Sequence, residues 1–150
     1  MIGADNTLNR FNVRVYGILE WEDQVLLIHE KIGDFHFTKF PGGGLELGEG
    51  LAECLIREFM EEAALPVAVD QHLYTTDFFQ QSMFRPTDQL ISVYYKVTAL
   101  ADPGLIRLDE FEIENDGKKE QLRFFWVRKE ALNPALVTFP IDKKVVELLR

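Results

Sequence analysis

The amino-acid sequence predicts a single α/β domain in which strands and helices are mixed along the chain. Segments of alternating or continuous apolar residues, typical of strands, occur in both halves, and two segments carry apolar residues at helical spacing. The 150 residues are 47% hydrophobic and include 12 Phe, which is enough for one packed core. No repeat or long linker divides the chain, so we expect one domain over residues 1–150.

The N-terminal third is expected to form a β-hairpin followed by a glycine loop. Residues 13–19 read as a strand, residues 21–23 as a turn and residues 25–28 as a more buried strand. Residues 41–44 are Pro-Gly-Gly-Gly, and consecutive glycines weaken either regular structure. We therefore expect a loop at 41–44.

A helix is expected over residues 50–64, because its apolar and charged residues separate onto two stripes. The apolar stripe consists of Ala52, Leu55, Ile56, Phe59, Met60 and Ala63. The opposite stripe consists of Glu53, Arg57, Glu58, Glu61 and Glu62. This arrangement predicts a helix that packs on one side and presents mainly carboxylates on the other.

The remainder of the chain is expected to be rich in strands until a final helix. Strands are predicted at residues 67–79, 90–100 and 122–127. The acidic stretch 102–119 is expected to be largely loop, with a short edge strand. Residues 142–150 have helical spacing, and Pro140 suits a helix start.

The composition excludes several classes of protein. A net charge of −9 disfavours a nucleic-acid polymer as partner, since such binders cluster Lys and Arg. No signal peptide or spanning segment is evident, so we expect a soluble, cytoplasmic protein with no membrane partner. The lone Cys54 cannot form an internal disulfide and is interpreted as structural. A small anionic substrate would need a cation to bridge it to an acidic site.

The glutamates of the predicted helix supply a candidate cation site. Glu58 precedes Glu61 by three residues and Glu62 by four, and like charges at these spacings each destabilise a helix by roughly 0.2–0.5 kcal/mol. Mg²⁺, or alternatively Mn²⁺, would reverse that effect, because hard cations prefer carboxylate oxygens and phosphates. The competing interpretation is a solvated acidic face. The glycines directly upstream favour the metal site, since they let backbone groups approach a metal or phosphate closely.

These residues also spell a known pattern. Gly43, five residues, Glu49, seven residues and then Arg57-Glu58-Phe59-Met60-Glu61-Glu62-Ala63-Ala64-Leu65 resembles the Nudix box, G-x5-E-x7-R-E-U-x-E-E-x-G-U with U apolar. Every charged position agrees at the right spacing, which makes the signal a specific one. Ala64 departs from the pattern, because the family usually has Gly there to leave the helix in a left-handed conformation.

The resemblance implies an α/β/α sandwich built around a mixed β-sheet and a Mg²⁺-dependent hydrolase of a nucleoside diphosphate linked to another moiety. It implies that Glu58, Glu61 and Glu62 are metal ligands, joined by the Gly43 carbonyl. Arg57 and Glu49 would orient the ligating glutamates. Water would attack phosphorus at the diphosphate bond.

The general base stays open between a box glutamate such as Glu61 and an acidic residue of a later loop, with Glu120 as our candidate. Its competitors are Glu112, Glu114 and Asp116. Arg14 and Lys39 are candidates for phosphate contact, and a base could stack on Phe35, Phe37, Phe78, Phe79 or Phe84. Nucleoside triphosphates, ADP-ribose, nucleotide sugars and dinucleoside polyphosphates all remain admissible substrates, and a homodimer is admissible.

Two other classes of protein compete with the hydrolase interpretation. The first is a non-catalytic, Nudix-like module that senses a nucleotide, which the intact glutamate set disfavours. The second is a Nudix-fold isomerase of an isoprenoid diphosphate, whose chemistry needs a catalytic Cys in a pocket, whereas Cys54 lies within the box helix.

Overall fold

The computed structural model describes residues 7–115 and 117–150. Within these residues, four strands precede the first helix and four more precede the second, joined in places by 3-10 turns. In order, the strands and helices are β1 (Arg10–Trp21), β2 (Gln24–Ile32), β3 (Phe35–Lys39), β4 (Gly42–Gly44), α1 (Leu51–Ala63), β5 (Val67–Thr75), β6 (Asp88–Ala99), β7 (Phe111–Asn115), β8 (Lys118–Arg128) and α2 (Pro140–Leu149). The predicted α/β class is confirmed.

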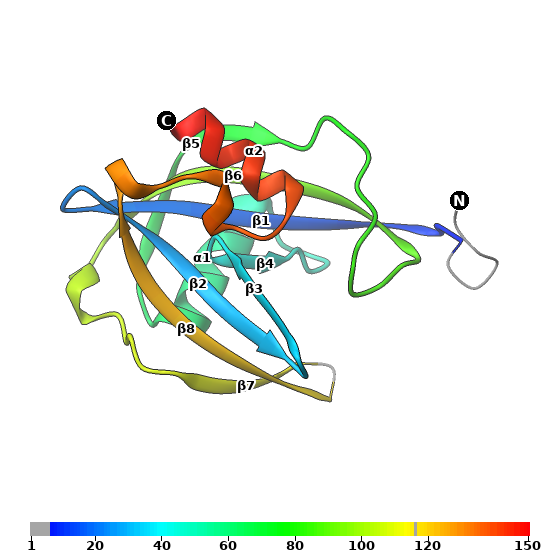
Figure 1. Ribbon diagram of the computed structural model, residues 1–150, viewed down its shortest axis with the longest axis horizontal. Helices are drawn as coiled ribbons and strands as arrows, with labels where there is room; N and C mark the ends of the chain where they lie inside the picture. The colour runs from blue at the N-terminus through cyan, green and yellow to red at the C-terminus, as the bar shows by residue number, and fades with distance from the viewer. Residues whose placement is uncertain (1–6, 116) are drawn as a thin grey trace.

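The strands form one mixed sheet in the order β5-β6-β1-β2-β8-β7. β1 and β6 run parallel, and the other pairs are antiparallel. α1 and α2 cover opposite faces of the sheet (Figure 1). The architecture is therefore the α/β/α sandwich that the resemblance implies.

The predicted hairpin between β1 and β2 is confirmed. Glu22 and Asp23 have positive φ angles of 49° and 59°. Positive φ at both central residues is what a two-residue type I′ turn between twisted strands requires. Only Glu20 and Trp21 of β1 then pair with Val25 and Gln24 of β2.

Beyond the hairpin, the two strands separate. β3 takes the free edge of β2 over Ile28 to Ile32, and β4 takes the edge of β1 over Arg14 to Tyr16. The sheet thus opens into two halves, and this opening positions the candidate site.

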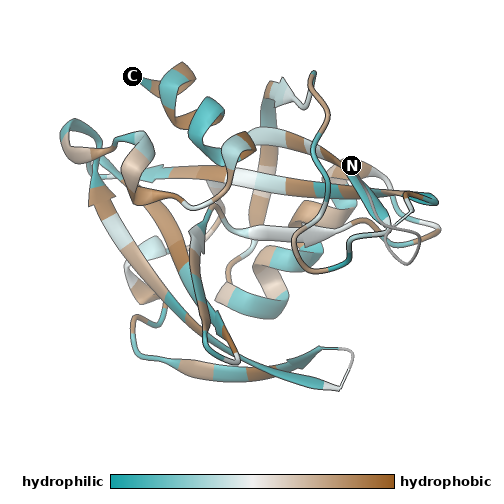
Figure 2. Ribbon diagram, turned by 45° about the vertical axis from the view of Figure 1, so that its right-hand side comes forward, coloured by the Kyte–Doolittle hydropathy of each residue, from teal (hydrophilic) through white to brown (hydrophobic). Residues whose placement is uncertain are grey.

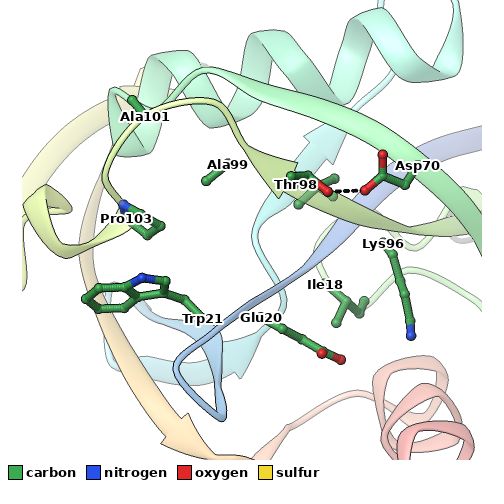
Figure 3. Close-up of a pocket in the computed structure, with 10 residues that line it drawn as sticks. Ile18, Glu20, Trp21, Asp70, Lys96, Thr98, Ala99, Ala101 and Pro103 are labelled. Carbon is green, nitrogen blue, oxygen red and sulfur yellow. Dashed lines mark hydrogen bonds between the residues drawn. The ribbon is translucent and has the colours of Figure 1, made fainter.

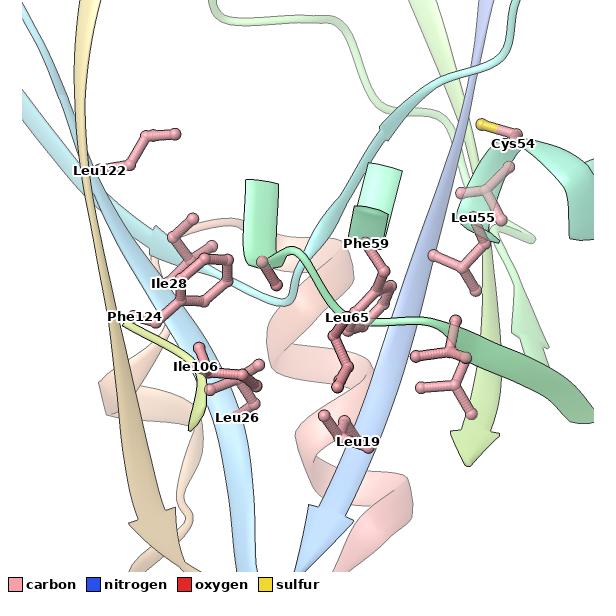
Figure 4. Close-up of a cluster of buried hydrophobic side chains, with 14 residues drawn as sticks. Leu19, Leu26, Ile28, Cys54, Leu55, Phe59, Leu65, Ile106, Leu122 and Phe124 are labelled. Atoms are coloured by element: carbon pink, nitrogen blue, oxygen red, sulfur yellow. The ribbon is translucent and has the colours of Figure 1, made fainter. Parts of the chain in front are cut away.

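Two hydrophobic cores lie on the two faces of the sheet. Alternation along β1 sends Val15 and Leu19 into the core beneath α1, while Tyr16 and Ile18 enter the core beneath α2. Figure 4 shows the first core, in which Phe59 and Leu65 pack among side chains of the central strands. Hydrophobic segments accordingly concentrate on the central strands in Figure 2.

Three predictions about elements need correction, and one strand was not predicted. Gly42–Gly44 is a strand rather than a loop, because the glycines pair with β1. The predicted strand at 67–79 ends at Thr75, and β3 was not predicted. The strand predicted at 122–127 is part of the longer β8, which begins at Lys118 and so shortens the predicted loop. The predicted edge strand within that stretch is β7, at one end of the sheet.

The apolar stripe predicted for the first helix is also partly wrong. α1 buries Cys54, Leu55, Phe59 and Ala63, whereas Ile56 and Met60 are 40% and 49% exposed. The buried stripe is therefore rotated toward the side of Glu58 and Glu62, which lie three residues after Leu55 and Phe59. This rotation turns two of the glutamates toward the sheet.

The helix ends as its box position requires. Ala64 adopts the left-handed conformation, with φ 50° and ψ 35°, and its N–H donates to the Met60 carbonyl. This conformation costs a non-Gly residue on the order of 1 kcal/mol. The second helix starts with Pro140 in its first turn, as predicted.

Candidate active site

The glycines of β4 bring the backbone against the acidic helix. A Cβ on Gly42 would lie 2.0 Å from the Val15 carbonyl oxygen, and a Cβ on Gly43 would lie 2.4 Å from Oε1 of Glu58. Both distances are shorter than any real Cβ contact. Glycine is therefore needed at position 42 so that β4 can pair with the backbone of β1, while glycine at position 43 lets the Glu58 carboxylate lie against the backbone.

Arg57 connects the loop after β4 with the glutamates of α1. Its Nε and Nη2 atoms donate to the two oxygens of Glu49 at 3.0 and 2.7 Å. Nη1 donates to Glu58 at 3.0 Å and to Glu61 at 3.3 Å, and Nη2 also reaches the Gly44 carbonyl at 3.1 Å. The hydrogen bonds from Arg57 lower the pKa of Glu49 to about 2. Arg57 thus links Glu49 to Glu58 and Glu61, and the orienting role of Arg57 and Glu49 stays a prediction.

Glu58 and Glu62 form a close carboxyl pair. Burial raises the pKa of Glu62 well above its ordinary range, Lys39 opposes this, and a hydrogen bond to Glu58 raises it further. The Glu58 side chain is only 14% exposed. Two carboxyl groups at i and i+4 of one helix face lie close enough for both to contact one divalent cation.

Glu61 lies differently from the other two predicted ligands. Its side chain is 57% exposed, and its carboxylate turns toward Arg57. Within residues 7–115 and 117–150, no three acidic, His or Cys side chains are gathered as a complete metal site. The structure therefore brings Glu58 against Gly43, with Glu62 one helical turn further on, and does not bring Glu61 to them. The role of these residues as metal ligands stays a prediction.

A buried ion pair that the sequence analysis missed lies beside the glutamates. Lys39 Nζ is 3.0 Å from Oε2 of Glu30, and both side chains are less than 10% exposed. Lys39 also donates to the Gly42 carbonyl at 3.2 Å and lies 5.2 Å from the centre of the Tyr16 ring. Burial works to lower the pKa of Lys39, but Glu30 and Tyr16 outweigh it and the pKa is raised. Lys39 is therefore a fixed cation in the wall of the site.

Arg14 lies on β1 in the same opening of the sheet. Its Nε donates to the Tyr16 hydroxyl at 2.6 Å, and the charges of Glu30 and Glu58 both act on it. Arg14 and Lys39 thus face the acidic groups from β1 and β3. Their contact with substrate phosphate stays a prediction.

Glu120 projects on the face that carries the site, and two of its competitors do not. Glu120 pairs with Ile32 of β2 and Ile113 of β7. Glu112 and Glu114 flank Ile113, so they point to the opposite face. Burial raises the pKa of Glu120, and Glu30 adds to the effect. The third competitor, Asp116, lies outside the described residues.

Cys54 has the properties of a structural residue. It is fully buried, and its thiol donates to the Gly44 carbonyl at 3.5 Å. Burial raises its pKa to about 12. A thiol held in its protonated form is a poor nucleophile, which disfavours the isomerase interpretation.

A hollow of about 400 Å³ lies away from these residues, where β1 and β6 end (Figure 3). Trp21, Lys96 and Pro103 line it, and Thr98 donates a hydrogen bond to Asp70 at its edge. None of the predicted site residues lines it.

Comparison with known proteins agrees with the box and the fold. The sequence model of the NUDIX domain matches residues 8–149. This chain belongs to the Nudix family. A segment of 73 residues is 36% identical to Nudix hydrolase 18, mitochondrial, of Arabidopsis thaliana. That match spans 49% of this chain and 40% of the length of the plant protein.

Solved structures of the Nudix family share the fold. A NUDIX hydrolase from Nitrosomonas europaea superposes with a TM-score of 0.68 at 20% identity, covering 92% of this chain and 87% of the other. A MutT protein from Methanosarcina mazei gives a TM-score of 0.68 at 18% identity, covering 94% of both chains. An ADP-ribose pyrophosphatase from Streptococcus suis gives a TM-score of 0.58 at 18% identity, covering 92% of this chain and 86% of the other. No helix in the described part of this Nudix protein has the length and apolar character to cross a membrane.

Proposed function

We propose that this Nudix protein is a pyrophosphohydrolase that cleaves the diphosphate bond of a nucleoside diphosphate linked to another moiety, with Mg²⁺ as cofactor. The observation that carries the proposal is the contact of the Glu58 carboxylate with the backbone of Gly43, held by a hydrogen bond from Arg57, with Glu62 one helical turn further on. These hard oxygen ligands suit Mg²⁺, with Mn²⁺ as the alternative metal.

In this mechanism Gly43, Glu58 and Glu62 would hold the cation, with Glu61 as the further ligand. Such a cation would supply acidity to a water and positive charge next to the phosphate oxygens. Glu120 accepts the proton as the water oxygen bonds to phosphorus and the bridging P–O bond breaks. Its raised pKa suits a base that works near neutral pH.

Arg14 and Lys39 are proposed to bind phosphate oxygens from the other side of the opening. Their positive charges balance an otherwise acidic site, which a substrate with several negative charges would not enter easily. The chain's net charge of −9 supports a small molecule over a nucleic-acid polymer. We also propose a cytoplasmic location, supported by the single, buried cysteine.

The test is a panel of nucleoside triphosphates, ADP-ribose, nucleotide sugars and dinucleoside polyphosphates, incubated with and without Mg²⁺ in ¹⁸O-water and scored by chromatography and mass spectrometry. We expect Mg²⁺-dependent cleavage with ¹⁸O in one phosphate product. Glu58→Gln should lower kcat by at least ~10²-fold.

Glu53→Gln is the matched control for this test. Glu53 lies on the same helix, but its carboxylate accepts from the Gly50 N–H at 2.9 Å and caps the helix, a role that Gln also performs. The Glu53→Gln variant should keep wild-type activity. Binding of a nucleotide without any product from the panel would instead indicate a sensing module.

A further inference from the structure

A small apolar hollow of about 220 Å³ adjoins the candidate site. Ile32, Phe35, Met83 and Phe84 line it. Ile32 pairs directly with Glu120 and lies two residues from Glu30, on the same face of β2. The hollow therefore lies next to the charged groups of the site.

The position of Phe84 is fixed by its neighbours. Its ring centre lies 5.6 Å from that of Phe35, 5.1 Å from that of Phe37 and 6.0 Å from that of Phe139. Two residues of β3 and the residue directly before α2 thus contact a ring from the loop between β5 and β6. Even so, 49% of the Phe84 side chain is exposed, which leaves a free aromatic surface.

The backbone around Phe84 is also ordered by local hydrogen bonds. The buried Ser82 hydroxyl accepts from the N–H groups of Phe84 and Arg85 at 3.2 and 3.1 Å. The Ser82 N–H donates to the Asp88 carbonyl at the start of β6. Binding at a hollow built in advance loses little conformational entropy.

The chemistry of the lining defines the ligand. All four residues are apolar, two are aromatic, and Met packs well against ring edges. No side chain of the lining has an N–H or O–H donor, or an oxygen or nitrogen acceptor, for the edge of a ring. The volume is below the ~300–1,000 Å³ typical of pockets that enclose a whole drug-sized ligand, so it suits one part of a substrate.

We propose that this hollow binds the planar ring of the diphosphate substrate by stacking against Phe84 and Phe35, without reading its polar edge. The proposal rests on the proposed function for the position of the phosphates. It also predicts tolerance among rings, because an apolar pocket discriminates poorly between ligands that differ only in polar groups. We infer that the protein accepts diphosphates of several bases.

The other aromatic candidates differ in their surroundings. Phe37 is buried behind the hollow and contacts Phe84 and Phe139. Phe78 and Phe79 are 40% and 58% exposed and do not line it. Phe11, which is 66% exposed on β1, does not line the hollow and is not one of the aromatic candidates.

The experiment compares two ligands that differ only by the ring. Binding of a nucleoside 5′-monophosphate and of ribose 5-phosphate is measured by calorimetry with Mg²⁺. Neither ligand contains a diphosphate bond, so the result does not depend on hydrolysis. In the wild-type protein we expect the ring to improve affinity by roughly 10-fold, the effect of one aromatic stack.

Three variants complete the test. Phe84→Ala and Phe84→Leu should each remove most of the affinity ratio between the two ligands, since Leu restores apolar volume but no ring. Phe11→Ala is the matched control and should keep the ratio. Melting temperatures close to wild type would show that the variants are folded.

Several results would overturn the proposal. The first is equal binding of the two ligands by the wild-type protein. The second is an unchanged ratio in Phe84→Ala or Phe84→Leu. Affinities for adenine, guanine, cytosine and uracil monophosphates that differ by more than ~100-fold would contradict edge-independent recognition. Loss of binding in these tests would leave the diphosphate cleavage assay unaffected, so the two proposals fail separately.

Discussion

The Glu58 carboxylate lies against the backbone of Gly43 so closely that a methyl group there would sit 2.4 Å from Oε1. We therefore expect Gly43→Ala to displace the carboxylate. A shift of about 1 Å in a catalytic group can cost ~10²-fold in rate, so kcat should fall by at least ~10-fold. Steady-state kinetics at several Mg²⁺ concentrations would measure this loss.

The neighbouring glycine supplies the control for this prediction. A Cβ on Gly44 would meet only Arg14 Nη1, at 3.5 Å, an ordinary contact. Gly44→Ala should therefore change kcat by less than about 2-fold, which is about 0.4 kcal/mol and within the ±0.5 kcal/mol of an unstrained substitution. Equal losses in the two variants would mean that the strand, rather than the Glu58 contact, is what matters.

A second prediction concerns the general base. Glu120→Gln should lower kcat by roughly 10²-fold and leave the Mg²⁺ dependence unchanged, because it removes a proton acceptor and no metal ligand. Glu112→Gln and Glu114→Gln, which alter the opposite face of β7, should have little effect. A larger loss in either of these two variants would reassign the role.

The third prediction concerns the stability of the Glu30 and Lys39 pair. Lys39→Met would leave the buried Glu30 carboxylate without its counter-charge, which typically costs roughly 3–5 kcal/mol in the free energy of unfolding. The double variant Glu30→Gln/Lys39→Met should recover at least half of that loss. Urea unfolding would measure both, and a loss below 1 kcal/mol in the single variant would show that the pair is dispensable.

The fourth prediction concerns the pH dependence of stability. Tyr94 donates to the buried Asp142 at 2.5 Å, and burial raises the pKa of Asp142 from 3.8 to about 6 despite this bond. The folded state therefore holds this proton more tightly than the unfolded state. Asp142 therefore adds to the free energy of unfolding at a pH below its pKa in the unfolded state. This contribution is lost as the pH rises through about 6, its pKa in the folded state.

The variant Asp142→Asn tests this linkage. The pKa of Asp142 shifts by about 2.2, from 3.8 to about 6. The free energy of unfolding of the wild-type protein should therefore fall by up to about 3 kcal/mol, relative to the variant, as the pH rises through these two values. Chemical unfolding of both proteins between pH 4 and 7.5 gives the difference. A difference that stays constant with pH would contradict the raised pKa.

The local features of the fold could be predicted from the sequence. The hairpin turn, α1 and α2 are determined by short-range patterns, and the box residues gave the positions of Glu58 and Arg57. The need for a left-handed residue at Ala64 followed from the same pattern. These features depend on neighbours within a few residues, which a single sequence displays directly.

Features that depend on distant partners could not be predicted. The glycines of β4 become a strand only because β1 offers a free edge, and no local pattern shows this. Lys39 and Glu30 lie on different strands, and their pairing follows from the register of β2 with β3. The inward position of Glu30, two residues after Ile28, was the only signal available for a buried charge.

The most direct test of the central claim is the Mg²⁺ dependence of thermal unfolding, compared between the wild-type protein and Glu58→Gln/Glu62→Gln at matched ionic strength. A cation bound only by the folded state stabilises it by about 2.7 kcal/mol at one hundred times Kd. The wild-type melting temperature should therefore rise with Mg²⁺, and the double variant should gain much less. Equal shifts in the two proteins would show that Glu58 and Glu62 form only a solvated acidic surface, and would contradict the metal site on which the proposed hydrolysis depends.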